Sequence, residues 1–207
     1  MEISRTSRSP PARRDSHVRA IGRFLDRKAC ALVLDELRFV HWEQSSVVDH
    51  HSTGPIVGTT YPGRISQTAY EEWFGTPLLR VVRTIERRLR PILHAHPNRY
   101  ERWQATRYFR GGKFEYHLDA GPWHTEPAGD RAATVLVYLD SPTRGGGTSF
   151  KHLDLRITPK PGTLIYWNNL RANGTPDPAM LHSGEPVRAG QKTVLVTWIR
   201  ERAVREE

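Results

Sequence analysis

The sequence predicts an α+β protein, in which a helical N-terminal half precedes a β-rich half that folds as a sandwich or barrel. Two observations support this. Apolar residues recur at helical spacing in two stretches before residue 100, whereas from Glu101 onward the apolar period changes to two. Turn clusters such as Arg144–Gly147 and Lys160–Gly162 divide the second half, with no helical stretch between them.

Two helices are expected in the N-terminal half. After a short strand at Ile21–Leu25, Asp26 can cap a helix that runs to Leu37. Thr76 begins the stronger helix as its cap, with a proline at the first helical position. Pro91 bends or ends this helix near its C-terminus. The apolar stripe of the stronger helix is Leu78, Leu79, Val82, Ile85 and Leu89.

Between these helices, residues 43–67 predict a long loop with at most short strands. His50 and His51 within it are adjacent, so their side chains diverge on any regular element, and we interpret them as solvated residues. Seven strands are expected in the second half, over residues 101–109, 113–119, 131–139, 154–158, 163–167, 180–183 and 192–200.

The chain of 207 residues fits one domain. Residues 1–16 predict a disordered basic tail, and residues 17–207 a single domain with a helical layer over 17–100 and a β core over 101–203. Cys30 is the single cysteine, which excludes an internal disulfide and favours a reducing cytoplasm. No apolar stretch reaches the roughly 18 residues of a membrane span, so no membrane partner is expected.

The formal net charge of +9 raises the question of nucleic-acid binding. Of the 31 basic residues, 26 are arginines, and they are scattered along the whole chain. The charge could equally reflect codon usage or attract an anionic co-substrate. We therefore rank nucleic acid low as a partner.

A histidine and an aspartate are placed to share one face of a strand. His117 and Asp119 are two residues apart, and alternate side chains of a strand point the same way. A third candidate ligand, His182, lies further along the chain. Two imidazoles and one carboxylate form the facial triad that suits non-heme Fe(II) and leaves open positions, two of which a 2-oxo acid can chelate.

A lysine at the start of the final strand completes the constellation. Alternation puts Lys192, Val194, Val196 and Trp198 on one face of residues 192–200. The far carboxylate of a chelated 2-oxo acid would be buried, and a buried charge requires a partner. Lys192 is well placed to be that partner.

Several motifs together resemble the prolyl 4-hydroxylase-like branch of the Fe(II)/2-oxoglutarate-dependent dioxygenases. The Y-x-x-G-x-x-[YF]-x-x-H-x-D pattern is present as Tyr108, Gly111, Phe114, His117 and Asp119. R-x-x-T-x-L-x-Y-L is present as Arg131, Thr134, Leu136, Tyr138 and Leu139. The last pattern runs from His182 through Gly184, Pro186, Val187 and Gly190 to Lys192 and ends in Trp198. The likeness extends to nearly everything but residues 1–16.

The resemblance implies a double-stranded β-helix (jelly-roll, cupin-like) core with N-terminal helices packed on one face. It implies His117, Asp119 and His182 as iron ligands and Lys192 as partner of the 2-oxoglutarate C5 carboxylate. Tyr108, Thr148 and Tyr138 match positions that help to hold 2-oxoglutarate. The implied cofactors are Fe(II), 2-oxoglutarate and O2, with ascorbate as an optional addition.

One position departs from the family's motifs, and a second matches them only if its strand is irregular. The family's G-G-E-T-x-F is present as Gly145–Phe150, with Gly147 in place of the glutamate, which removes a local support of Thr148. Arg131 matches a substrate-contacting position, but on a regular strand it faces away from Tyr138. That role for Arg131 therefore requires a bend in the strand.

The implied reaction is hydroxylation of an unactivated C–H bond, coupled to decarboxylation of 2-oxoglutarate to succinate. A carboxylate at Asp119 argues against halogenation, because a halide would need that coordination position. The expected substrate is a prolyl residue of a peptide or protein, or an amino acid of a biosynthetic pathway. The alternatives are a nucleic-acid demethylase of the same metal class and a non-catalytic metal-binding β-barrel protein.

Two segments are expected to cover the substrate and to order only when it binds: residues 43–67 and 121–130. The second follows Asp119 directly, so Trp123 and His124 should lie near the mouth of the pocket. Trp123 offers a flat apolar surface for a ring, and Trp198 is a further candidate substrate contact. His124 is not expected to be a fourth ligand.

Overall fold

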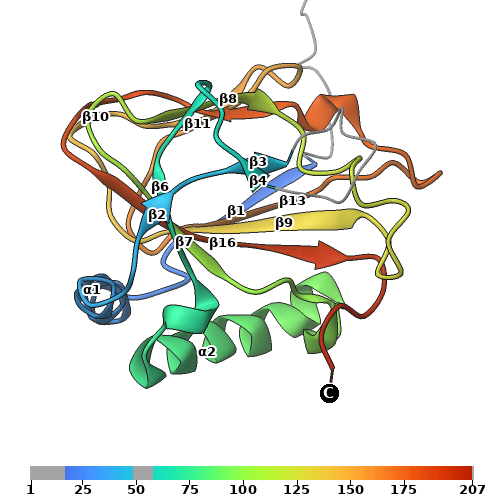
Figure 1. The fold of residues 1–207 in the computed structure, drawn as a ribbon, viewed down its shortest axis with the longest axis horizontal. Helices are drawn as coiled ribbons and strands as arrows, with labels where there is room; N and C mark the ends of the chain where they lie inside the picture. Colours follow the sequence, from blue (N-terminus) through green and yellow to red (C-terminus); the bar gives the residue numbers. More distant parts are fainter. Residues whose placement is uncertain (1–16, 49–57, 207) are drawn as a thin grey trace, which may run out of the picture.

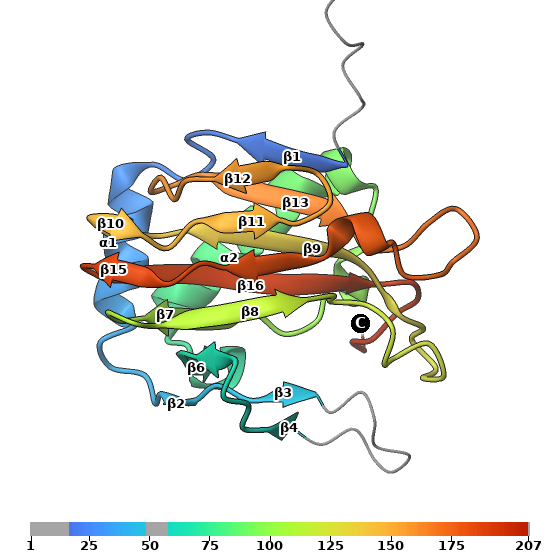
Figure 2. The same cartoon turned by 90° about the horizontal axis from the view of Figure 1, so that it is seen from above.

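Antiparallel strand pairing dominates the computed structural model, which describes residues 17–48 and 58–206. Two sheets lie face to face, and two helices cover the outer face of the larger sheet (Figure 1). Seen from above, the strands of the smaller sheet lie over those of the larger one (Figure 2). This is the expected double-stranded β-helix with helices on one face.

The larger sheet has seven strands in the order β1-β13-β9-β16-β7-β6-β2. Its middle strand, β16, pairs with β9 on one side and β7 on the other, and all its residues are buried. The strands of this sheet are β1 (Val18–Ile21), β2 (Glu43–Gln44), β6 (Gln67–Tyr70), β7 (Gln104–Tyr108), β9 (Arg131–Tyr138), β13 (Leu164–Asn168) and β16 (Lys192–Arg200).

The smaller sheet has the order β12-β11-β14-β8-β5. Its strands are β5 (Arg64–Ile65), β8 (Lys113–His117), β11 (Thr148–Phe150), β12 (Leu155–Ile157) and β14 (His182–Gly184). Two further pairs join β3 (Val47–Val48) to β4 (Gly58–Thr59), and β10 (Arg144–Gly145) to β15 (Val187–Ala189). Three short 3-10 helices lie at Glu71–Trp73, Pro97–Arg99 and Pro178–Met180.

Both expected helices are present. α1 spans Arg27–Glu36, and the carboxylate of Asp26 caps it by accepting from the backbone N–H of Ala29 at 2.7 Å. α2 spans Thr76–Leu93 and continues two residues beyond Pro91. Its cap is Gly75 rather than Thr76, because the Gly75 carbonyl already accepts a helical bond from the N–H of Leu79.

Some sequence expectations were wrong in position. The first strand is β1 at Val18–Ile21, not 21–25, because its register is fixed by pairing with β13. Residues 17–100 are also not only a helical layer, since they supply strands to both sheets. Residues 43–67 do carry only short strands in their described part. The proposed tail 1–16 and the pair His50–His51 lie outside the described residues.

Two apolar layers hold these elements together. One lies between the helices and the larger sheet and includes Val82 and Ile85 of α2 and Leu195 of β16. The other lies between the two sheets and includes Phe150, Trp167 and Val194. No described helix is long and apolar enough to cross a membrane. The polar site is built into the second layer, at the ends of β8 and β14.

Candidate metal site and its two cavities

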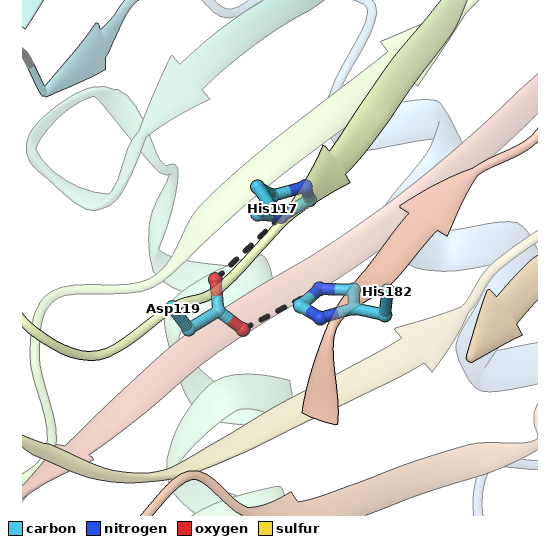
Figure 3. Close-up of side chains that lie close together, drawn as sticks. All are labelled: His117, Asp119 and His182. Carbon is cyan, nitrogen blue, oxygen red and sulfur yellow. Dashed lines mark ion pairs between the residues drawn. The ribbon is translucent and has the colours of Figure 1, made fainter. Parts of the chain in front are cut away.

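His117, Asp119 and His182 converge between the sheets (Figure 3). His117 ends β8, and His182 begins the neighbouring β14 directly opposite it in the register. The Nε2 atoms of His117 and His182 lie 3.8 and 3.5 Å from the carboxylate oxygens of Asp119. All three ligand atoms lie within 4.8 Å of one another, and no other such group occurs among the residues that the structure describes.

Backbone carbonyls orient both imidazoles. Nδ1 of His117 bonds to the carbonyl of Glu115 at 2.8 Å, and Nδ1 of His182 to that of Met180 at 2.9 Å. Each Nδ1 therefore carries the proton, and each Nε2 presents its lone pair to the centre. Burial, assisted by the neighbouring His182, lowers the pKa of His117 to about 3. An imidazole that stays unprotonated in this way can bind a metal ion.

The carboxylate of Asp119 is kept charged despite its burial. Burial alone would raise its pKa, but His182, His117 and Arg131 together hold that pKa below its ordinary value. Thr134 adds a hydrogen bond to Oδ2 at 2.6 Å. Two imidazoles that present Nε2 and one carboxylate fit Fe(II), which was the ligand set expected from the sequence.

The cluster stands where two cavities meet. An inner cavity of about 60 Å³ and an outer cavity of about 740 Å³ share five lining residues: Arg64, Phe114, His117, Asp119 and Trp198. A metal held here would face both spaces. One cavity could take a small chelating molecule and the other a larger substrate.

Lys192 lines the inner cavity only. Its side chain is buried, and its Nζ lies 4.3 Å from the centre of the Tyr108 ring, opposite it on β7. Burial lowers the pKa of Lys192 to about 8, although Glu185 and Asp140 favour its charged form. The expected apolar companions Val194, Val196 and Trp198 line the same cavity, which confirms the predicted face of β16.

Thr148 and Tyr138 are joined by a hydrogen bond of 2.6 Å between their hydroxyl oxygens. Thr148 lines the inner cavity, whereas Tyr138 stands behind it and does not line the cavity itself. Tyr138 was expected to hold the co-substrate directly. Its position instead suits support of Thr148.

Arg131 reaches the outer cavity because β9 contains an extra residue. Ala133 pairs with Ile199 and Arg131 with Arg200, so Ala132 has no register partner on β16 and the alternation of side chains is reversed. This irregularity is the bend that the sequence required. The guanidinium lies 3.7 Å from the ring centre of Trp123 and 3.6 Å from that of Trp198, and all three residues line the outer cavity.

Glu101 holds Arg131 in that stack by accepting two hydrogen bonds of 2.7 Å from the guanidinium. Arg131 therefore combines a flat surface with a neutralised charge. His124 lines neither cavity, and its Nδ1 bonds to the carbonyl of Gly121 at 2.7 Å. It is not a fourth member of the cluster.

The segment after Asp119 is tied to the end of β16. Asp130 accepts from the N–H of Gly121, and Glu201 accepts from the N–H of Asp130, each at 2.7 Å. Arg202 donates to the carbonyl of Pro127 at 2.7 Å. These bonds link the segment that carries Trp123 to the end of β16. That residues 121–130 order only with substrate stays a prediction.

Arg64 was missed by sequence analysis. It lies in a stretch interpreted as loop, yet it lines both cavities and lies over the Phe114 ring at 4.7 Å. Its guanidinium donates to the carbonyl of Ser46 at 2.7 Å, and burial lowers its pKa. No local pattern marks this arginine, because the pairing of β5 with β8 is what brings it to the site.

Residues 103–200 match the family model of the 2OG-Fe(II) oxygenase superfamily. Prolyl 4-hydroxylase subunit alpha-2 of Caenorhabditis elegans is 32% identical over 163 residues, which cover 76% of this chain and 29% of that protein. The human prolyl 4-hydroxylase subunit alpha-1 is 32% identical over 158 residues, covering 72% and 29%. The chain thus spans less than a third of the length of these relatives.

Solved structures share the fold. The viral collagen prolyl hydroxylase of Paramecium Bursaria Chlorella virus-1, in its 2OG complex, has a TM-score of 0.67 at 24% identity, covering 90% of this chain and 97% of that one. A Trichoplax adhaerens prolyl hydroxylase, in complex with a hypoxia inducible factor oxygen degradation domain peptide fragment, has a TM-score of 0.65 at 15% identity, covering 90% and 84%.

Proposed function

The chain belongs to the prolyl 4-hydroxylase-like 2OG-Fe(II) oxygenases, and from this premise we propose that it hydroxylates prolyl residues of a peptide or protein. One observation carries the proposal. A two-histidine, one-carboxylate cluster stands at the junction of a small cavity that ends in a buried lysine and a large cavity walled by aromatic rings.

In this proposal His117, Asp119 and His182 hold Fe(II). Bound Fe(II), 2-oxoglutarate and O2 supply the oxidising power, since decarboxylation of 2-oxoglutarate to succinate and CO2 is coupled to transfer of one oxygen atom to a C–H bond. The protein contributes fixed ligands, because hydrogen bonds set the imidazole orientations and orient the Asp119 carboxylate before any metal binds.

The inner cavity is the proposed place of 2-oxoglutarate. Lys192 would pair with its distal carboxylate, with Tyr108 and Thr148 beside it and Tyr138 supporting Thr148. A carboxylate removed from water needs such a partner, and Lys192 makes no direct ion pair among the described residues, although the charges of Glu185 and Asp140 favour its ammonium form. The distal carboxylate of 2-oxoglutarate would therefore be the ion-pair partner of the Lys192 ammonium group.

The outer cavity is the proposed place of the substrate. Trp123, Arg131 and Trp198 form a flat stack against which a pyrrolidine ring can pack, and the volume of about 740 Å³ favours a peptide over a free amino acid. A prolyl hydroxylase of the same fold has been solved with a peptide fragment. A reducing compartment is proposed from the single cysteine, Cys30, whose thiol is buried and free.

Incubation of the Fe(II)-loaded protein with 2-oxoglutarate and a panel of proline-containing peptides and free amino acids tests the proposal. We expect peptide-dependent succinate and a peptide mass raised by one oxygen atom. His182→Ala should abolish both, whereas His124→Ala, a histidine outside both cavities, should not. Succinate at the wild-type rate from His182→Ala would overturn the assignment of the ligands.

A further inference from the structure

Gly147, directly before β11, and Glu185, directly after β14, are neighbours at one edge of the smaller sheet's β11–β14 pair. Thr148 pairs with Gly184 in the register, and the N–H of Glu185 donates to the carbonyl of Gly147 at 2.8 Å. The side chain of Thr148 faces the inner cavity. Because side chains alternate along a strand, positions 147 and 185 both look to the opposite, outer face.

On the outer face of the smaller sheet, the carboxylate of Glu185 connects side chains from neighbouring strands. It accepts hydrogen bonds from Nε of Arg156 at 2.7 and 2.9 Å and from Oγ of Ser149 at 2.5 Å. These partners lie on β12 and β11, while Glu185 follows β14 directly. One carboxylate thus connects three strands immediately behind Thr148.

The same carboxylate fills the space that a side chain at position 147 would take. A Cβ built on Gly147 would lie 2.7 Å from Oε2 and 3.1 Å from Cδ of Glu185, and 3.2 Å from Cζ of Arg156. These atoms are the movable ends of long side chains. Gly145 and Gly146 adopt positive φ, but Gly147 does not, so its backbone could carry a side chain if that space were free.

We propose that Glu185, directly after β14, supplies the carboxylate that the G-G-E-T-x-F motif carries at position 147, and that Glu185 positions Thr148 and Lys192 at the end of the inner cavity where 2-oxoglutarate would bind. Only the positioning of the 2-oxoglutarate site rests on the proposed function; the relocation of the carboxylate does not. Cross-strand neighbours on one face lie close enough for either to place a carboxylate at the same point. The missing glutamate at Gly147 is then a relocation and not a loss.

Two contacts connect Glu185 to the inner cavity. Ser149, which it binds, adjoins Thr148, whose hydroxyl meets that of Tyr138. Gly184, which precedes it, lies against Lys192, since a Cβ at Gly184 would be 3.5 Å from Nζ. The negative charge of Glu185 also favours the ammonium form of Lys192.

A double-mutant cycle tests the relocation: Glu185→Ala, Gly147→Glu and the double variant Gly147→Glu/Glu185→Ala. Glu72→Ala serves as a matched control, because Glu72 forms a similar pair with Arg102 at 2.6 Å, outside both cavities. The melting temperature of each protein and the anaerobic Kd of 2-oxoglutarate with the Fe(II)-loaded protein are measured.

We expect each single variant to lower the melting temperature and to weaken 2-oxoglutarate binding about fivefold. This is the modest effect expected when a partly exposed ion pair is lost. The double variant should return both quantities to near wild type, with binding within about twofold. The control should leave 2-oxoglutarate binding unchanged. If the two single effects simply add in the double variant, the relocation is wrong.

The pH dependence separates positioning from a purely structural role. In Glu185→Ala, the pH above which 2-oxoglutarate binding weakens should move lower, because Lys192 loses a favourable negative neighbour, and the double variant should restore it. A rescued melting temperature with unchanged 2-oxoglutarate binding in all variants would overturn the positioning role. If the wild type binds no 2-oxoglutarate, the proposed function fails, while the melting temperatures still decide the relocation.

Discussion

Thr134 donates a hydrogen bond of 2.6 Å to Oδ2 of Asp119, and Asn169 donates one of 2.9 Å to the Thr134 hydroxyl oxygen. The amide therefore directs the single proton of the hydroxyl toward the carboxylate. All three side chains are buried, so water does not compete for these groups. The carboxylate ligand is held by a relay that begins on β9 and just after β13.

Thr134→Val should weaken metal binding about 10- to 100-fold, because the isosteric side chain removes only the hydrogen bond that orients Asp119. Thr106→Val is the matched control, since the Thr106 hydroxyl is equally buried but makes no hydrogen bond within the described residues. Anaerobic Fe(II) titration measures both. Equal affinities in the two variants would show that the relay does not orient the ligand.

Lys192→Ala should reduce the affinity for 2-oxoglutarate by roughly two to three orders of magnitude, since loss of one partner of a buried ion pair costs about 3–5 kcal/mol. Lys192→Arg should be intermediate, because the charge remains but the geometry of the donors differs. Steady-state KM for 2-oxoglutarate checks this. An unchanged KM in the alanine variant would refute the pairing.

The affinity for 2-oxoglutarate should fall as the pH rises above about 8. Burial lowers the pKa of Lys192 to about 8 in the free protein, so above this pH the lysine is neutral and must take up a proton to bind the anion. Affinity then declines up to about tenfold per pH unit. Calorimetry in buffers of different ionisation enthalpy measures the proton uptake, and Lys192→Arg, which stays charged, should lack this decline.

Lys192 also makes the free energy of unfolding depend on pH. The folded pKa of about 8 lies below the ordinary value of 10.5, so between these values the unfolded chain binds more protons. The free energy of unfolding should therefore rise with pH through that window. Denaturant unfolding of the free protein at pH 8 and pH 10 tests the sign, and Lys192→Met should remove this contribution.

Glu201→Ala should raise KM for the peptide about three- to tenfold and leave KM for 2-oxoglutarate nearly unchanged. The variant loses the acceptor of the Asp130 N–H and frees the segment that carries Trp123, far from the Lys192 end of the inner cavity. Hydrogen exchange should show the amide of Asp130 protected without substrate in wild type and exposed in the variant. Fast exchange of that amide in wild type would instead support ordering by substrate.

Local periodicity was enough to predict the parts of the site that lie within one strand. The face that Lys192 shares with Val194 and Val196 follows from alternation along β16. Asp119 was expected on the same strand as His117, but β8 ends at His117, and Asp119 reaches the cluster from two residues beyond the strand end. The two main helices likewise follow from caps and apolar spacing. These features depend on residues close in sequence, so the sequence carries them directly.

Features created by pairing between distant segments could not be predicted. The strands β10, β11 and β15 have only two or three residues, too few to show a period. Arg64 reaches the two cavities because β5 pairs with β8. The proposed transfer of a carboxylate from position 147 to Glu185 depends on the register of β11 with β14. In each case the deciding information is which strands become neighbours.

The middle strand of the larger sheet, β16, comes after every other described strand in sequence. During synthesis, β7 and β9 leave the ribosome with no strand to bridge them, and all three ligand residues are already made. The edges of β7 and β9 that pair with β16 therefore stay unpaired until residues 192–200 have been synthesised. A chain that is truncated before residue 192 would therefore lack the middle strand of its larger sheet.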